Sequence, residues 1–354
     1  MSALCDPDPL SIAAARREFA PEAAVMPNCD ELSASRVVDW VFVGSPNCHH
    51  SGHVLSALRA GKPVFCEKPL ATTLDDCLAV AHAVKASGLP FAFGLVLRYS
   101  PLYSRLKELL EQGCIGRILS FEFNETLSYN HGGYIMGNWR RFRGTSGTHL
   151  LEKCCHDLDL ANWLTESVPI YAASFGGLDF FRPENEKHAV RIGPDEQGRP
   201  AYQGWEDPHR VDPFRGERDI VDNQVAILQY ASGARATFHT NCNAGLAERR
   251  FYLLGETGTL RADALTGVIE LRGIGPRGEN RRINVGEANS HAGGDPFLVK
   301  SLADIVLAGA KPRAGIDEAL RSAIAAFGVD AALDSREVVD LRPLWKRAAI
   351  NPGL

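Results

Sequence analysis

The segment Arg36–Ala71, RVVDWVFVGSPNCHHSGHVLSALRAGKPVFCEKPLA, decides the fold class of this 354-residue chain. Its first part is a β-branched and aromatic run that ends at Gly44, which is typical of a buried parallel strand. Apolar residues at helical spacing follow, and Gly61 can end that helix. A second short strand, Val64–Cys66, then meets Pro69. The order strand, helix, strand predicts a parallel sheet with a right-handed crossover.

The same alternation continues toward the C-terminus. Thr72 or Thr73 is expected to cap a helix, because acidic residues occupy its first turn. The run FAFGLVL, Phe91–Leu97, is another apolar strand. We therefore predict an α/β fold class, with a Rossmann-like parallel sheet over residues 1–98.

Residues 99–354 follow a different pattern. After a helix over Pro101–Gln112, strands succeed one another with turns between them, as in the hairpin expected around Ser232 and Gly233. This pattern predicts an α/β domain with a mostly antiparallel, open sheet. The polar excursion Arg182–Arg218 gives no assignment. Asp295 is expected to cap a late helix, and the C-terminal helices are expected to pack back on the first domain.

Composition excludes several classes of partner. The formal net charge of −5 gives no basic field, so no nucleic acid is expected. No apolar run approaches the roughly 18 residues that span a bilayer, so no membrane is expected. The N-terminus lacks the features of a signal peptide. The nine cysteines are odd in number and form no C-x-x-C, which favours reduced thiols in a cytoplasmic protein.

A second informative stretch is THLLEKCCHDLDLANWL, Thr148–Leu164. It leaves a metal site, a redox pair and a proton-transfer site open. No closed Cys/His spacing accompanies His149, Glu152, Cys155 and His156, so no metal is favoured. Adjacent cysteines seldom form a comfortable disulfide. Histidine suits proton transfer because its unperturbed pKa is ~6.5. Glu152 and His156 are four residues apart, so they are expected to share one face of a helix. A carboxylate in that position would favour the charged form of the imidazole. An ion pair on the protein surface, without any catalytic role, would have the same spacing.

Three segments read together resemble the glucose–fructose oxidoreductase / inositol dehydrogenase / rhizopine-catabolism (Gfo/Idh/MocA) family. They are Gly44–Ala71, Leu97–Ile118 and Asn138–Leu164, which contain P-N-x-x-H, A-G-K-x-V-x-x-E-K-P-L and carboxylate-x-x-x-His in that order. The resemblance implies a nicotinamide dinucleotide fold, followed by a domain whose open sheet often supports oligomerisation. A homo-oligomer, either a dimer or a tetramer, is therefore expected.

The resemblance also implies a catalytic trio of Lys68, Glu152 and His156. Lys68 would hydrogen-bond the substrate oxygen and stabilise developing negative charge, while His156 would act as the base. The family commonly has aspartate at the position of Glu152. The added methylene leaves open whether this carboxylate contacts His156 or the substrate.

Ligands of open parallel sheets bind beyond the carboxyl ends of the strands. An acidic residue after the second strand of such a fold holds the adenosine ribose and repels a 2′-phosphate, so Asp6 favours NAD over NADP. His291 also fits a family pattern, although a plain helix-start loop explains it equally well. The expected cofactor-binding residues are Asp6, Ser45, Pro46, Asn47, His50, Glu67, Lys68 and Arg98, and the expected substrate-binding residues are Tyr99, Trp139, Arg140 and His149.

The dinucleotide fingerprint G-x-G-x-x-G is absent, and MSALCDPDP looks like the end of the second strand of the fold. We therefore expect that about thirty residues of the functional protein, one β-α unit, are lacking. The absent strand would be central, and each buried backbone group left unpaired costs about 1–3 kcal/mol. Its loss would also remove the helix N-terminus that receives the pyrophosphate and so impair NAD binding.

Three functions compete at this point. The first is an NAD-dependent dehydrogenase acting on a sugar, inositol or related polyol. The second is an NAD-assisted glycosidase, which uses transient oxidation to break a glycosidic bond. The third is a regulator that binds dinucleotide without catalysis, or a truncated and inactive homologue. The retention of Lys68, Glu152 and His156 favours the first.

Overall fold

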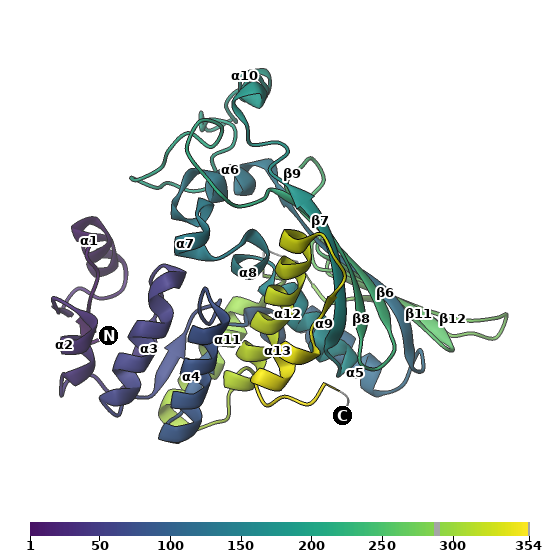
Figure 1. The fold of residues 1–354 in the computed structure, drawn as a ribbon, viewed down its shortest axis with the longest axis horizontal. Coiled ribbons are helices and arrows are strands. Elements are labelled where there is room, and N and C mark those ends of the chain that lie inside the picture. Colours follow the sequence, from purple (N-terminus) through teal and green to yellow (C-terminus); the bar gives the residue numbers. More distant parts are fainter. Residues whose placement is uncertain (287–290, 353–354) are drawn as a thin grey trace.

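The computed structural model describes residues 1–286 and 291–352 and contains three sheets within them. Figure 1 shows the helices of the first domain on the left and the large sheet of the second domain on the right. Helices α9 (Cys155–Thr165), α12 (Ile316–Ser335) and α13 (Arg342–Arg347) lie between the two. None of the described helices is long and apolar enough to cross a membrane.

The first domain contains two parallel ladders. Strands β3 (Val41–Val43), β4 (Val64–Cys66) and β5 (Phe91–Phe93) form one, in the order β3-β4-β5. Strands β1 (Ala3–Leu4) and β2 (Ala24–Val25) form the other. The predicted parallel sheet is confirmed, although β3 and β5 are shorter than their apolar runs.

Helices join the parallel strands as the sequence predicts. Thr73 is the N-cap of α4, and its Oγ1 accepts a hydrogen bond from the amide of Asp76 at 3.2 Å. Gly88 ends this helix in the left-handed region, with φ of +64°, where glycine meets no steric penalty. The helices of this domain are α1 (Pro9–Glu18), α2 (Cys29–Ala34), α3 (His50–Arg59) and α4 (Leu74–Ser87).

The two ladders do not pair with each other in the described part of the chain. Among the described strands, β1 pairs only with β2, and β3 pairs only with β4. Phe42, on β3, is 50% exposed. In the expected strand order, the glycine-rich strand lies between these two ladders.

The second domain is built on a sheet whose described strands follow the order β13-β12-β11-β10-β6-β9-β8-β7-β14. Every neighbouring pair is antiparallel except β6 with β9, so the predicted mostly antiparallel sheet is confirmed. The hairpin around Gly233 joins β8 to β9. The strands are β6 (Ile118–Ser128), β7 (Pro169–Gly177), β8 (Asn223–Tyr230), β9 (Arg235–Ala244), β10 (Arg250–Gly255), β11 (Gly258–Asp263), β12 (Val268–Gly273), β13 (Asn280–Asn284) and β14 (Val339–Asp340).

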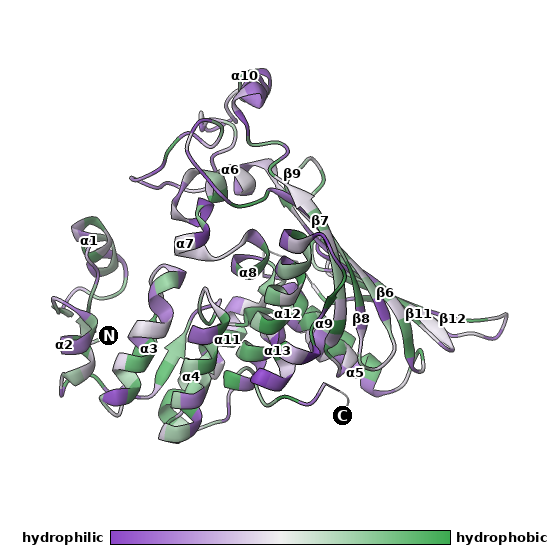
Figure 2. Cartoon of the chain, in the orientation of Figure 1, coloured by the Kyte–Doolittle hydropathy of each residue, from purple (hydrophilic) through white to green (hydrophobic). Residues whose placement is uncertain are grey.

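One face of this sheet is covered by helices, and the same helices reach the first domain. α12 contacts β7 and α9 on one side and α4 on the other. In Figure 2 the strands of the first domain and parts of these central helices carry the hydrophobic colour. α5 (Pro101–Glu111) also contacts β12, whereas α11 (Gly294–Ala308) packs against residues 96–99. The expected cap at Asp295 is wrong, because the helix begins at Gly294 and the Asp295 carboxylate binds His291 instead.

The excursion that the sequence left unassigned packs on α6 (Tyr129–Gly137) and contains α10 (Lys187–Ile192). Gly133 permits this contact, because a Cβ there would lie 2.0 Å from the oxygen of Tyr202. Gly132 in turn lets α6 approach β9, because a Cβ there would lie 1.7 Å from the oxygen of Cys242. α10, hydrophilic in Figure 2, lies at the outer end. A second apolar cluster holds the excursion, formed by Leu127, Ile135, Met136, Phe181, Tyr202, Phe214, Ile220 and Cys242.

Candidate active site

Lys68 and Glu152 meet at the junction of the two domains. Lys68 follows β4, and its Nζ donates to the main-chain oxygen of Glu152 at 2.6 Å and to its Oε1 at 3.2 Å. The two side chains are 18% and 6% exposed. Burial alone would lower the pKa of Lys68, but the carboxylate of Glu152 outweighs it and the pKa is raised. The ammonium is therefore charged, as stabilisation of a substrate oxygen requires.

Arg140 binds the same carboxylate. Its Nε donates to Glu152 Oε1 at 3.0 Å, and its Nη1 donates to the hydroxyl of Tyr134 at 3.0 Å. The guanidinium lies 4.3 Å from the ring centroid of Trp139, a cation–π distance. Burial would raise the pKa of Glu152, but Lys68 and Arg140 hold that pKa well below its ordinary value. Glu152 is consequently a fixed anion rather than a proton acceptor.

The expected helical face shared by Glu152 and His156 is wrong. α8 (His149–Glu152) ends before α9 begins at Cys155, and Lys153 and Cys154 form the break between them. Cys154 has φ −90° and ψ 3°, outside regular helix. The carboxylate therefore turns to Lys68 and Arg140.

His156 is buried in a cationic environment, with 2% exposure. Its Nδ1 has no hydrogen-bond partner among the described residues. Burial lowers the pKa of His156 well below its ordinary value, and the charges of Lys68, Arg249 and Lys153 lower it further. The expected stabilisation of the charged imidazole by Glu152 is therefore wrong. His156 is neutral at physiological pH, which is the state that can accept a proton.

A buried ion network lies beneath His156. Arg249 donates to Asp157 at 2.8 and 2.7 Å, and to Glu125 at 3.1 Å. Lys153 Nζ lies 3.4 Å from Glu125 Oε1. Burial raises the pKa of Asp157, whereas Arg249 and Lys153 overcome the burial of Glu125 and lower its pKa. Two cations thus balance two carboxyl groups in the interior.

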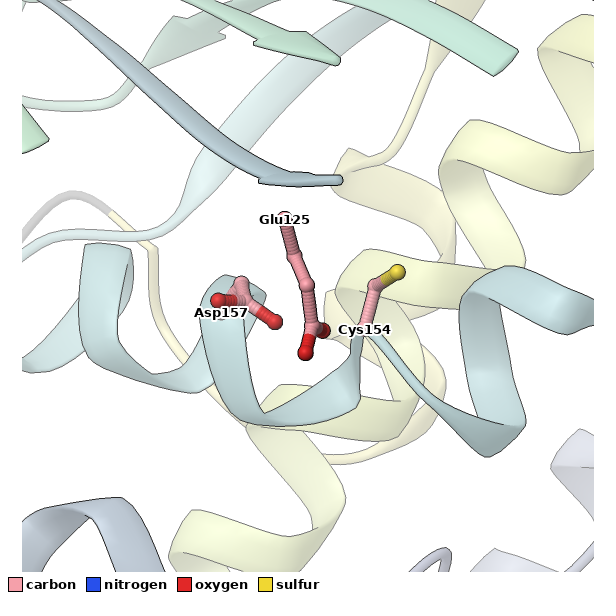
Figure 3. A group of neighbouring side chains, drawn as sticks. All are labelled: Glu125, Cys154 and Asp157. Atoms are coloured by element: carbon pink, nitrogen blue, oxygen red, sulfur yellow. The ribbon is translucent and has the colours of Figure 1, made fainter. Parts of the chain in front are cut away.

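Figure 3 shows the carboxyl groups of Glu125 and Asp157 side by side, with Cys154 on the other side of Glu125. Each offers a possible metal ligand, and these atoms lie within 4.8 Å of one another. The carboxylates are already ion-paired with Arg249 and Lys153, and burial raises the pKa of the Cys154 thiol well above its ordinary value. A cation would have to displace both basic side chains, so the arrangement fits an ion network better than a metal site.

The loops after β3 and β4 are joined by His50. Its Nδ1 lies 2.6 Å from the oxygen of Pro69, and its Nε2 lies 2.8 Å from the oxygen of Ser45. Asn47 follows Pro46, and its side-chain Nδ2 donates a hydrogen bond to the main-chain oxygen of Ser146 at 2.8 Å. This hydrogen bond connects the two domains. His50 and Asn47 therefore hold the shape of the edge at which a cofactor would bind.

The same edge is where the nicotinamide half of a dinucleotide would bind in a parallel sheet of this kind. Glu67 lies against Gly94, where a Cβ would come within 2.7 Å of its Oε2, so this carboxylate would have to shift if Gly94 carried a side chain. Burial raises the pKa of Glu67. Together with Ser45 and Lys68, these groups lie at the carboxyl ends of three parallel strands. Asp6 is exposed just beyond β1, and its Oδ1 accepts from the amide of Asp8.

Three residues with expected ligand roles lie inside the packing. Arg98 donates to Asp159 at 2.7 and 2.8 Å, and the hydroxyl of Tyr99 accepts from the amide of Arg313. His149 Nε2 lies 3.0 Å from Thr240 Oγ1. None of these contacts tests the cofactor role of Arg98 or the substrate roles of Tyr99 and His149, which stay predictions.

Sequence reasoning missed Lys153, Arg249 and Tyr134. Lys153 had a weak signal, because it is followed directly by two cysteines in a segment with leucines on both sides, and a lysine buried there needs an anion. Arg249 had none, since its partners Glu125 and Asp157 are 124 and 92 residues away.

The parallel sheet, with a lysine at its carboxyl edge and a buried neutral histidine, defines a nicotinamide-dependent oxidoreductase. The chain belongs to the Gfo/Idh/MocA oxidoreductase family: the model of its NAD-binding Rossmann fold matches residues 1–95, and that of its C-terminal alpha/beta domain matches residues 107–337. The expected family resemblance is confirmed. The domain boundary at residues 98 and 99 stays a prediction.

Individual relatives agree with this membership. Inositol 2-dehydrogenase 3 of Saccharopolyspora erythraea is 44% identical over 245 residues, which cover 68% of this chain and 59% of that protein. The 2,7-anhydro-N-acetylneuraminate hydratase of Escherichia coli is 32% identical over 152 residues, 43% of this chain and 40% of that protein. The structure of levoglucosan dehydrogenase with NADH and levoglucosan shares the fold, with a TM-score of 0.77 at 18% identity, over 96% of this chain and 90% of that chain.

Proposed function

We propose that the protein oxidises a secondary alcohol of a sugar, inositol or related polyol, and reduces NAD. The observation that carries this proposal is the Lys68–Glu152 ion pair beside the buried, neutral His156. The Lys68 ammonium would bind the substrate oxygen, and His156 would accept the hydroxyl proton. Glu152 would hold the ammonium charged and in place. A bound nicotinamide supplies the hydride acceptor.

The relatives support a polyhydroxylated ring as the substrate. One relative is an inositol 2-dehydrogenase, and a structural neighbour holds levoglucosan together with NADH. Arg140 and Trp139 lie beside Glu152, where they could line the substrate side of the site. Asp6 supports NAD over NADP, because a carboxylate after β1 would repel a 2′-phosphate.

A panel of sugars, inositols and polyols with NAD or NADP, followed by NADH absorbance, tests the proposal. We expect a cyclic polyol or sugar to give NADH with NAD preferred. Equal rates with NADP would contradict the role of Asp6. No reduction of either cofactor across the panel would contradict the dehydrogenase.

A redox-neutral reaction is a second candidate, because one relative is a hydratase. Transient oxidation and re-reduction would change the sugar without net NADH. Product analysis of the same panel by chromatography distinguishes the two candidates: a changed sugar without accumulated NADH supports the second, and NADH formed in proportion to a ketone supports the first.

We also propose that the protein is a cytoplasmic homo-oligomer. The nine cysteine thiols are all unpaired, as is typical of a reducing compartment. The open face of the large sheet exposes Phe175, Val225 and Ile227, of which Ile227 is 61% exposed. An apolar strip of this kind favours contact with a second copy. Cell fractionation tests the compartment, and an Ile227 variant tests the assembly.

A further inference from the structure

The residues around His156 suggest how the proton that it accepts from the substrate reaches solvent. We propose that His291 and Asp295 form a relay that passes the proton accepted by His156 to solvent. This inference rests on the proposed function, because that function makes His156 the group that receives a proton in each turnover.

Three of the four cationic or basic side chains whose charges act most strongly on His156 are unsuited to take the proton. The charges that act on the imidazole come from Lys68, Arg249, Lys153 and His291. Lys68 is held as an ammonium by Glu152, and Arg249 is a permanent cation. Lys153 is ion-paired with Glu125. His291 is the remaining group of the four that has a basic nitrogen.

The geometry of the two histidines suits a relay. Their ring centroids lie 6.1 Å apart at an interplanar angle of 56°, a separation that one ordered water can bridge. His291 Nδ1 lies 2.8 and 3.1 Å from the two carboxylate oxygens of Asp295. A carboxylate on Nδ1 keeps a proton on that nitrogen, and Nε2 is then the atom that accepts.

Solvent access rises along the same line. His156 is 2% exposed, whereas the side chains of His291 and Asp295 are 32% and 52% exposed. Burial lowers the pKa of His291 overall. The hydrogen bond and the charge of the Asp295 carboxylate oppose this effect and raise the pKa. Asp295 therefore favours the imidazolium that forms when His291 accepts the proton.

The proton balance of the step is simple. As hydride leaves the substrate carbon for the nicotinamide, the substrate O–H bond breaks and an N–H bond forms on His156. That bond then breaks as an N–H bond forms on His291, directly or through the bridging water. His291 releases a proton to solvent, and both histidines return to the neutral state.

Kinetics of His291→Asn test the relay. We expect kcat to fall by about 10²-fold, the lower end of general acid–base contributions, with the KM for NAD within twofold and partial recovery on addition of imidazole. His82→Asn, on the exposed face of α4, is the matched control and should retain full activity. Unchanged kcat overturns the relay, and so does a loss that imidazole does not rescue.

A second readout does not depend on turnover. Long-range proton–nitrogen spectra of the protein without cofactor report each imidazole. We expect the His156 signals to shift in His291→Asn but not in His82→Asn, and the His291 pKa to fall in Asp295→Asn. His156 signals that do not respond to His291→Asn overturn the relay. A wild-type protein that reduces no cofactor with any sugar contradicts the proposed function instead, so the two failures are distinguishable.

Discussion

The Lys68 ammonium lies 2.6 Å from the main-chain oxygen of Glu152 and 3.2 Å from its carboxylate, although the two residues are 84 positions apart. One comes from the parallel sheet, and the other comes from the segment under the large sheet. The contact joins the two domains at the point where the chemistry is proposed. It also fixes the protonation states of both groups, which leaves the proton to His156.

Replacing His156 removes the proposed base. We expect His156→Ala to lower kcat by roughly 10²–10⁴-fold, the usual contribution of general base catalysis, with NADH affinity nearly unchanged. Steady-state kinetics and calorimetric titration of NADH measure the two quantities. Unchanged turnover would exclude His156 from the mechanism.

Neutralising Glu152 changes the pH dependence of the reaction. The carboxylate raises the pKa of Lys68, and burial lowers it. In Glu152→Gln only burial remains of these two effects, so the pKa of Lys68 falls and the ammonium is lost at lower pH. We expect the alkaline limb of the kcat/KM profile to move to lower pH. Glu152→Asp, which keeps the charge, should move it less; an identical profile in Glu152→Gln would contradict the ion pair.

The ion network beneath His156 contributes to stability through its pairing. Removing Arg249 leaves Glu125 and Asp157 buried with less compensation, and breaking a buried pair typically costs about 3–5 kcal/mol. We expect Arg249→Met to lower the free energy of unfolding by that amount in urea titrations. Arg117→Met, which breaks an exposed pair with Glu256, should cost no more than about 1 kcal/mol. Equal losses in the two variants would refute the distinction.

The open face of the large sheet is expected to bind a second copy. Ile227→Arg places a charge in the apolar strip with Phe175 and Val225, and should shift the protein from oligomer to monomer in sedimentation velocity. Val190→Arg, at an exposed aliphatic residue on α10 away from this sheet, serves as the control. An unaltered sedimentation coefficient for Ile227→Arg would place the interface elsewhere.

The sequence predicted the features that depend on local pattern. The strands around Val41, Val64 and Phe91, the Thr73 cap and the Gly233 hairpin all follow from apolar periodicity and turn chemistry.

The site was predictable only in part. The order of the motifs predicted correctly that Lys68 and Glu152 lie close together. The predicted contact between Glu152 and His156 required a continuous helix, and the helix is interrupted at Lys153 and Cys154. Spacing along one segment also cannot reveal partners from distant strands, such as Arg249. The lowered pKa of His156 depends on these distant cations, so its direction was expected wrongly.

The most direct test compares Lys68→Met with Lys85→Met, an exposed lysine on α4. The measurement is kcat/KM for the best sugar or polyol of the panel, with NADH affinity determined alongside. The account predicts a loss of roughly 10²–10³-fold for Lys68→Met, the scale of losing one group that stabilises a developing negative charge, and none for Lys85→Met. Full activity in Lys68→Met would contradict it.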